Sequence, residues 1–177
     1  MSALTNLGGG LWAGGPALPR PPEQPPEPKV PAAVVYLERP DGRVLALTRG
    51  TDYADWHMPG GKWEPRDGTP GSIFYYAYTA IREVQEETGI LLTPDNLRPI
   101  HHYTTTPNPR RPGSGGRAVT VFVAEGCTWW PDDFHRYPAG QPAWMPPSFL
   151  TLPTCSLGPD AAIILRAVAD DRARRSQ

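Results

Sequence analysis

The stretch PGGKWEPRDGTPGSIFYYAYTAIREVQEETGI, residues 59–90, ends in a predicted helix that carries three glutamates close to its end. At about 100° per residue, Glu83, Glu86 and Glu87 fall on one helical face. Like-charged neighbours destabilise an isolated helix, and the negative end of the helix dipole adds to that effect. A bound cation would offset it, and clustered carboxylate oxygens are ligands that suit Mg²⁺ or Mn²⁺. The stretch therefore predicts either a divalent-cation site or a solvated acidic face.

Two glycines and a lysine, Gly60, Gly61 and Lys62, come between a predicted strand end and this helix. Glycine allows backbone angles that other residues avoid, and it lets a carbonyl oxygen approach a bound ion. The ammonium group of Lys62 is a candidate for contacting a phosphate. This context favours the cation site over the acidic face.

The helix is expected over residues 69–88. Thr69 suits the N-cap, Pro70 suits the first helical position, and Gly89 stands where a C-terminal glycine belongs. The aromatic run IFYYAY, residues 73–78, falls in the early turns of this helix. Its rings are expected to pack against other parts of the protein, with stacking on a nucleobase as the alternative.

The 177 residues are expected to form one folded domain behind an N-terminal arm. The arm, residues 1–31, is too rich in glycine and proline for regular structure, and it is either a disordered tail or a homodimer contact. Short apolar and β-branched runs predict strands at residues 32–38, 44–49, 56–58, 98–105, 117–125 and 142–146. Asp41-Gly42 predicts a hairpin turn between the first two. With an amphipathic helix at 158–175, this order predicts an α/β or α+β domain with a mixed sheet.

The composition argues against several classes of function. A formal net charge of −1 gives no reason to expect general binding to nucleic acid or to membranes. The longest apolar run is too short to span a bilayer, and the N-terminus lacks the pattern of a signal peptide. Cys127 and Cys155 show no Cys-x-x-Cys spacing, which argues against zinc and leaves a reduced, cytoplasmic protein as the expectation.

The segments PGGK and REVQEETGI together resemble the Nudix box, the signature of the Nudix (MutT-like) hydrolases. That pattern is a glycine, five residues, a glutamate, seven residues, and then Arg-Glu-hydrophobic-any-Glu-Glu-any-Gly-hydrophobic. Its second half is matched at every defined position, by Arg82, Glu83, Val84, Glu86, Glu87, Gly89 and Ile90. The resemblance implies a Nudix-like α/β/α sandwich with a mixed β-sheet, and a Nudix hydrolase domain over residues 32–177.

The first half of the box departs from the pattern. Counting five residues on from Gly61 leads to Asp67, where the family has glutamate, and 14 residues then precede Arg82 where the family has seven. Seven extra residues are close to two helical turns, so a lengthened box helix would keep the glutamates in phase. Asp67 is the uncertain box acid, because it is one methylene shorter and a longer helix would hold it away from Arg82.

The resemblance also implies a mechanism and site residues. Glu83, Glu86, Glu87 and Arg82 would be catalytic, and Mg²⁺ or Mn²⁺ would be held by those three glutamates and a carbonyl of Gly60. The reaction implied is hydrolysis of the pyrophosphate bond in a nucleoside diphosphate linked to X, such as a nucleoside triphosphate or an ADP-ribose-like compound.

Other candidates surround this core set. Residues expected to contact a nucleotide-type substrate are Lys62, Trp63, Arg110, Arg111 and Arg117. Candidates for the further carboxylate that many family members take from outside the box are Glu125, Asp132 and Asp133, although each is better explained as a solvated loop acid.

Two alternatives remain open from the sequence. An isopentenyl-diphosphate isomerase-like enzyme on the same fold would need Cys127 in the cleft. A non-catalytic Nudix module that senses nucleotides would need no intact acidic cluster, and the stretched box keeps that reading open.

Overall fold

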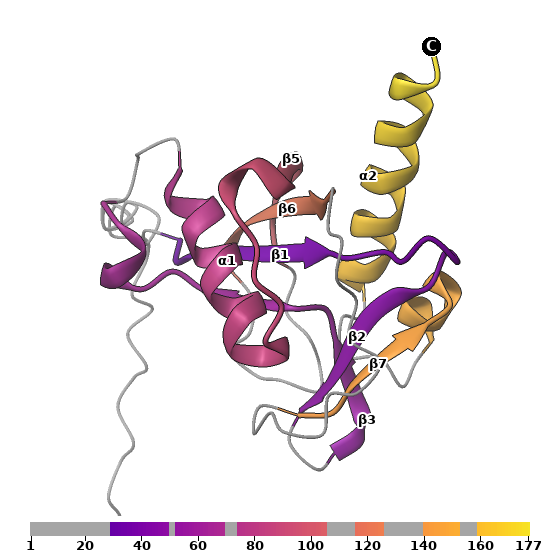
Figure 1. The fold of residues 1–177 in the computed structure, drawn as a ribbon, viewed down its shortest axis with the longest axis horizontal. Coiled ribbons are helices and arrows are strands. Elements are labelled where there is room, and N and C mark those ends of the chain that lie inside the picture. The colour runs from indigo at the N-terminus through magenta and orange to yellow at the C-terminus, as the bar shows by residue number, and fades with distance from the viewer. Residues whose placement is uncertain (1–28, 50–51, 70–73, 106–115, 126–139, 153–158) are drawn as a thin grey trace, which may run out of the picture.

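A computed structural model describes residues 29–49, 52–69, 74–105, 116–125, 140–152 and 159–177. Two helices and two β-sheets pack into an α/β/α sandwich with a mixed sheet, as the sequence predicts (Figure 1). Among the described residues, no helix combines the length and apolar character needed to cross a membrane. The N-terminal arm, and with it the predicted homodimer contact, lies outside the described residues except for its last three positions.

The larger sheet contains four strands in the order β4-β1-β6-β5. Their bounds are Gly60–Lys62 for β4, Pro31–Tyr36 for β1, Ala118–Ala124 for β6 and Leu97–Thr104 for β5. β1 and β6 run parallel, and the other two pairings are antiparallel. β1 is buried along nearly its whole length because both faces of this sheet are covered.

The two helices cover opposite faces of this sheet. Ala33 and Val35 of β1 pack with α1 (Tyr75–Thr88) in one core cluster, whereas Tyr36 packs with α2 (Pro159–Arg175) in a second one. Successive side chains of a strand point to opposite faces, so this division places the sheet between the helices. α1 is amphipathic, with Val84 on its buried face.

The smaller sheet has the order β3-β2-β7, with bounds Asp52–His57, Val44–Arg49 and Pro142–Met145. The predicted turn is present: Gly42 has φ 83°, and its N–H donates to the carbonyl of Arg39 at 2.9 Å. The predicted hairpin is present but short. The N–H of Arg39 donates to the carbonyl of Arg43 at 2.8 Å and that of Leu45 donates to the carbonyl of Leu37 at 2.9 Å, around one antiparallel bridge between Glu38 and Val44. Beyond this bridge, β1 and β2 belong to different sheets. A turn signal fixes the reversal of the chain, but not how far the two strands stay paired.

The predicted start of the long helix is wrong. α1 has 14 residues and begins at Tyr75, after Phe74, so it is not lengthened and Thr69 is not its N-cap. Pro70 lies outside the described residues. The predicted C-terminus is confirmed, because Gly89 follows the last helical residue in the left-handed conformation with φ 73°.

Candidate active site

The site is built where the start of β4 passes under the C-terminal half of α1. The N–H of Gly60 donates to Oε2 of Glu87 at 2.9 Å, which fixes that carboxylate over the glycine. A Cβ added to Gly61 would lie 2.3 Å from Oε1 of Glu83, so the second carboxylate occupies the space that a side chain would fill. The two glycines therefore let two glutamates of the helix approach the backbone of the strand.

Alanine at these two glycines is expected to have different effects. In Gly61→Ala the new methyl meets the far end of a flexible side chain, so Glu83 moves aside; we expect Mn²⁺ binding about tenfold weaker and little change in Tm. In Gly60→Ala the methyl would lie 2.3 Å from the backbone oxygen of Ala33, at a residue with φ 148°. We therefore expect Gly60→Ala to lower the free energy of unfolding by roughly 1–3 kcal/mol or more. Thermal denaturation and Mn²⁺ titration separate the two; equal loss of stability in both would contradict this account.

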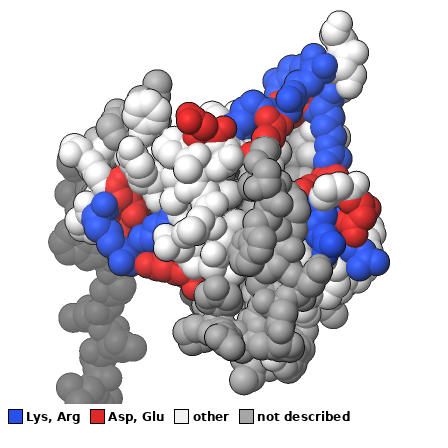
Figure 2. Space-filling model, viewed as in Figure 1, with Lys and Arg blue, Asp and Glu red and all other residues white. Residues whose placement is uncertain are grey.

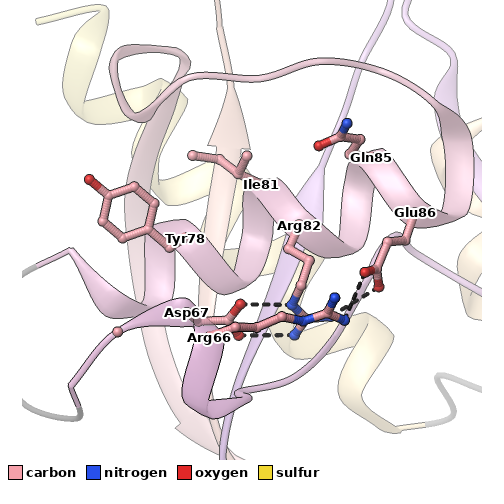
Figure 3. A pocket seen from close by; sticks show the side chains of 8 residues that line it. Arg66, Asp67, Tyr78, Ile81, Arg82, Gln85 and Glu86 are labelled. Atoms are coloured by element: carbon pink, nitrogen blue, oxygen red, sulfur yellow. Dashed lines mark hydrogen bonds and ion pairs between the residues drawn. The ribbon is translucent and has the colours of Figure 1, made fainter.

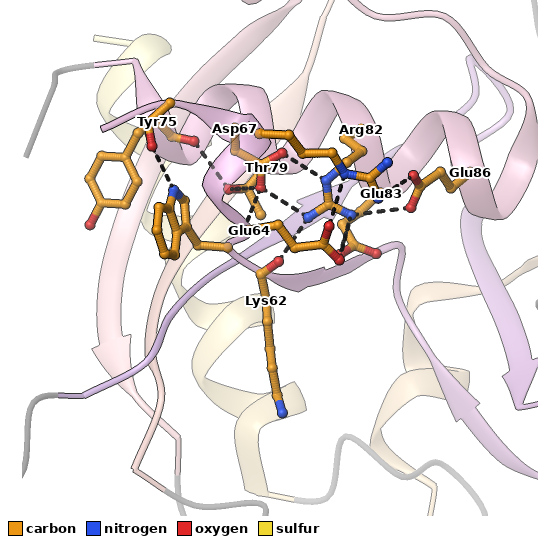
Figure 4. Close-up of polar contacts among 11 residues, drawn as sticks. Lys62, Glu64, Asp67, Tyr75, Thr79, Arg82, Glu83 and Glu86 are labelled. Carbon is orange, nitrogen blue, oxygen red and sulfur yellow. Dashed lines mark hydrogen bonds and ion pairs between the residues drawn. The ribbon is translucent and has the colours of Figure 1, made fainter. Parts of the chain in front are cut away.

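Arg82 and Asp67 form the buried centre of the site (Figure 4). Nε of Arg82 donates to Oδ1 of Asp67 at 2.7 Å and Nη2 donates to Oδ2 at 2.9 Å, a two-pronged pairing. Nη2 also donates to the carbonyl of Lys62 at 2.8 Å. The expectation that Asp67 is held away from Arg82 is thus wrong, because the helix begins at Tyr75 and the extra residues precede it.

The 3-10 turn η1, Pro65–Asp67, delivers Asp67 to this position. The carboxylate of Asp67 accepts hydrogen bonds from the N–H of Glu64 and from Oγ1 of Thr79, each at 2.9 Å. Burial opposes ionisation of this carboxyl, but the hydrogen bonds from Arg82, Glu64 and Thr79 outweigh it and lower its pKa. Asp67 is therefore charged and tied to two points of α1.

Glu86 is held by two guanidinium groups. Its Oε2 accepts from Nη1 of Arg82, four residues earlier, at 3.1 Å, and its Oε1 accepts from Nη2 of Arg66 at 2.8 Å. Nε of Arg66 donates to Glu64 at 2.8 Å, and Nη1 of Arg82 donates to Oε1 of Glu83 at 2.8 Å. Glu64 and Arg66 were not predicted as site residues. Their position in the sequence between Gly61 and the box acid Asp67 could have indicated them.

Carboxylates outnumber guanidinium groups in this acidic cluster, which consists of Glu64, Asp67, Glu83, Glu86 and Glu87 with Arg66 and Arg82. Five negative charges against two positive charges leave a net charge of −3 when all are ionised. Burial, with Glu86 and Glu64 nearby, raises the pKa of Glu83 despite the opposing effect of Arg82. An excess of carboxylates is the donor set that fits a hard divalent cation.

The carboxylates of Glu64, Asp67, Glu83 and Glu86 are turned toward the arginines, and that of Glu87 accepts from the N–H of Gly60. Within the described part of the chain, no three acidic, histidine or cysteine side chains converge closely enough to form a metal site by themselves. Nη1 of Arg82 contacts Glu83 and Glu86 at once, and this explains the arrangement. A cation would have to compete with the guanidinium groups for these oxygens.

The match to a family model decides which family this is. The model described as the NUDIX domain matches residues 28–157. The chain belongs to the Nudix family. The predicted family, the Nudix hydrolases, is therefore confirmed.

Solved Nudix structures share the fold. A MutT NUDIX hydrolase from Burkholderia pseudomallei matches with a TM-score of 0.57 at 21% identity, over 80% of this chain and 99% of that chain. An Ap4A hydrolase from C. elegans matches with a TM-score of 0.53 at 20% identity, over 81% and 98% of the two chains. A MutT/nudix family protein from Enterococcus faecalis is longer: with a TM-score of 0.45 and 20% identity, the match covers 67% of this chain and 44% of that one. A search of curated proteins finds no match.

The other predicted Nudix site residues fall into three groups. Trp63 and Arg117 lie at one end of the larger sheet. The N–H of Trp63 donates to the carbonyl of Pro31, and Ala118, the residue after Arg117, is paired with Pro31 in the sheet. Lys62 takes part through its carbonyl, and its side chain extends away from the carboxylates (Figure 4). Outside the described residues lie Arg110, Arg111, Asp132, Asp133 and Cys127.

Glu125 belongs to a different charge cluster. It accepts hydrogen bonds from Arg98 and Arg175, and Arg98 in turn contacts Asp171 of α2 at 2.5 Å. The structure therefore places Glu125 at the contact between β5 and α2 and away from the acidic cluster on α1. Figure 2 shows these two groups of charged side chains as separate patches.

The expected packing of the aromatic run is observed for part of it. Tyr75 is buried and packs on Tyr76 with ring centroids 3.9 Å apart. Phe74 and Tyr78 remain exposed, with relative exposures of 54% and 48%. Tyr78 lines an open hollow beside the acidic cluster (Figure 3), and its stacking on a nucleobase stays a prediction.

Proposed function

We propose that this Nudix protein hydrolyses the pyrophosphate bond of a nucleoside diphosphate linked to X, with Mg²⁺ or Mn²⁺ as cofactor. The observation that supports this most is the acidic cluster of net charge −3, packed on Gly60 and Gly61. A diphosphate is itself negatively charged and is repelled by these carboxylates. A divalent cation between the diphosphate and the carboxylates would remove this repulsion, so the cluster is suited to cation-dependent binding of a phosphate group.

We assign the cation to Glu86, Glu87 and the carbonyl oxygen of Gly60, with Glu83 as either a further ligand or the general base. When bound, it supplies charge neutralisation at the phosphate oxygens and acidifies a water. Arg82 acts as a positioning residue, because its one guanidinium holds Glu83, Glu86 and Asp67 in register.

Hydrolysis adds one water across the P–O–P bridge. The water oxygen bonds to one phosphorus, the bridging oxygen leaves with the other phosphate, and one proton is released to a base. We propose Glu83 as that base, because burial raises its pKa toward the range useful for proton transfer. Its alternative role is that of a cation ligand.

For the substrate, we propose a nucleoside triphosphate, a dinucleoside polyphosphate or an ADP-ribose-like compound. The solved relatives that share this fold include a MutT hydrolase and an Ap4A hydrolase, and these support the class of substrate but not its base. Trp63 and Arg117, at one end of the sheet, are proposed to contact the nucleotide, together with Lys62, Arg110 and Arg111.

The test is a panel of these compounds with Mg²⁺, Mn²⁺ or EDTA, with products separated by anion-exchange chromatography. We expect one class of compound to be cleaved with either cation and no cleavage in EDTA. Cleavage of no compound would overturn the proposal and favour the nucleotide-sensing module. Conversion of isopentenyl diphosphate to its allylic isomer, lost in Cys127→Ala, would instead establish the isomerase.

A further inference from the structure

We infer that Arg66 binds the phosphate of the substrate, and that it is released for this role only when a cation takes the carboxylate of Glu86. The inference rests on the proposed function, since it assigns a further substrate contact in the same site. It concerns a residue outside the box positions that carry the family resemblance.

Arg66 is held by two exposed carboxylates. Its Nε contacts Glu64 and its Nη2 contacts Glu86, each at 2.8 Å. The side chain of Arg66 is 59% exposed, and those of Glu64 and Glu86 are 47% and 45% exposed. Exposed ion pairs contribute little to stability, so this arrangement is readily exchanged for another.

The second arginine on Glu86 is bound very differently. The side chain of Arg82 is only 12% exposed and grips the buried Asp67 with two hydrogen bonds. When a divalent cation draws Glu86 away from its guanidinium partners, Arg82 keeps its other contacts. Arg66 then keeps only its exposed pair with Glu64 through Nε, so its Nη2 is the group that is set free.

The freed side chain has space in which to meet an anion. Arg66 and Glu86 both line an open hollow of about 750 Å³, within the size range of small-molecule sites (Figure 3). The remaining lining residues are Asp67, Gly68, Tyr78, Ile81, Arg82 and Gln85. A divalent cation changes the net charge of the acidic cluster from −3 to −1 and leaves a guanidinium fork beside it. Such a fork matches the geometry of phosphate oxygens.

The first test is titration of the protein with Mn²⁺ alone, followed by electron paramagnetic resonance. Arg66→Gln removes one of the two guanidinium groups that compete with the cation for Glu86, so we expect Mn²⁺ to bind about two- to fivefold more tightly, the scale of one exposed ion pair. Arg66→Lys keeps the charge, and its Mn²⁺ affinity is expected to lie between those of the wild type and Arg66→Gln.

The second test is calorimetric binding of methylenediphosphonate, which cannot be hydrolysed, to protein saturated with Mn²⁺. We expect Arg66→Gln to weaken this binding about tenfold, the scale of one charge-assisted hydrogen bond. The matched control is Arg43→Gln, because Arg43 is 60% exposed and is also paired with an exposed carboxylate, that of Asp41. It should leave both affinities unchanged.

Several results would overturn the inference: no binding of Mn²⁺ by the wild type, Mn²⁺ affinity in Arg66→Gln equal to or weaker than that of the wild type, or unchanged diphosphonate affinity. None of these measurements involves turnover. Failure of the hydrolase proposal, seen as no cleavage of any nucleotide, is therefore distinguishable from failure of this one.

Discussion

Glu86→Gln and Glu87→Gln are each expected to lower kcat/KM by at least about 100-fold, the scale of losing one preorganised electrostatic contact in an enzyme site. Glutamine keeps the size of the side chain and removes its charge. The carboxylate of Glu87 accepts from Gly60, and that of Glu86 is the one shared by two guanidinium groups. The loss should appear mainly in kcat, measured at saturating Mg²⁺ with whichever nucleotide the wild type cleaves.

The control for charge removal is Asp170→Asn. Asp170 is an exposed residue of α2 that pairs with Arg166 one helical turn away. Its replacement changes the net charge by the same amount and should leave kcat/KM within about twofold of the wild type, because surface pairs of this kind contribute little. Glutamine variants as active as this control would show that the acidic cluster is a solvated face and not a reaction site.

Asp67→Asn is expected to be the most destabilising of the charge substitutions. The side chains of Asp67 and Arg82 are 2% and 12% exposed, and removing one partner of such a pair leaves a buried charge uncompensated. We expect a loss of about 3 kcal/mol, the low end of the usual range, because Arg82 keeps its contacts with Glu83 and Glu86. For a chain of this size that corresponds to a fall in Tm of about 6 to 12 °C.

The same substitution has a predictable pH dependence. Because the folded protein lowers the pKa of Asp67, its carboxylate adds stability above the unfolded pKa of about 4, and this stability is lost as pH falls through the folded value. The difference between wild type and Asp67→Asn should therefore shrink below about pH 4. Asp41→Asn, at an exposed ion pair with Arg43, should cost about 1 kcal/mol or less. Equal losses in the two variants, or a gap that widens in acid, would contradict the buried-pair account.

The sequence was sufficient where a feature depends on spacing along one element. Glu83, Glu86 and Glu87 share a face because helical geometry requires it, and Gly89 ends the helix because only glycine adopts that conformation easily. β2 lies at 44–49, as its apolar run predicts. These features are local, so no long-range contact was needed to infer them.

Features that depend on contacts between distant residues could not be predicted in this way. Thr69 and Pro70 look like a helix start, but Asp67 is bound by Thr79 and Arg82 and the helix begins at Tyr75. Long-range pairing thus outweighs the local capping signal. The division of the strands into two sheets, and the seating of Arg66 on Glu86, are long-range in the same sense.

The contacts of Asp67 have a consequence for the length of the chain between Asp67 and α1. Thr79 and Arg82 pin the chain at Asp67, and the next fixed point is the first turn of α1. The segment between Asp67 and Tyr75 thus has both of its ends at α1, one through the contacts of Asp67 and the other through the start of the helix. The length of the chain between Asp67 and Tyr75 is therefore not set by the contacts that hold Asp67 against Thr79 and Arg82.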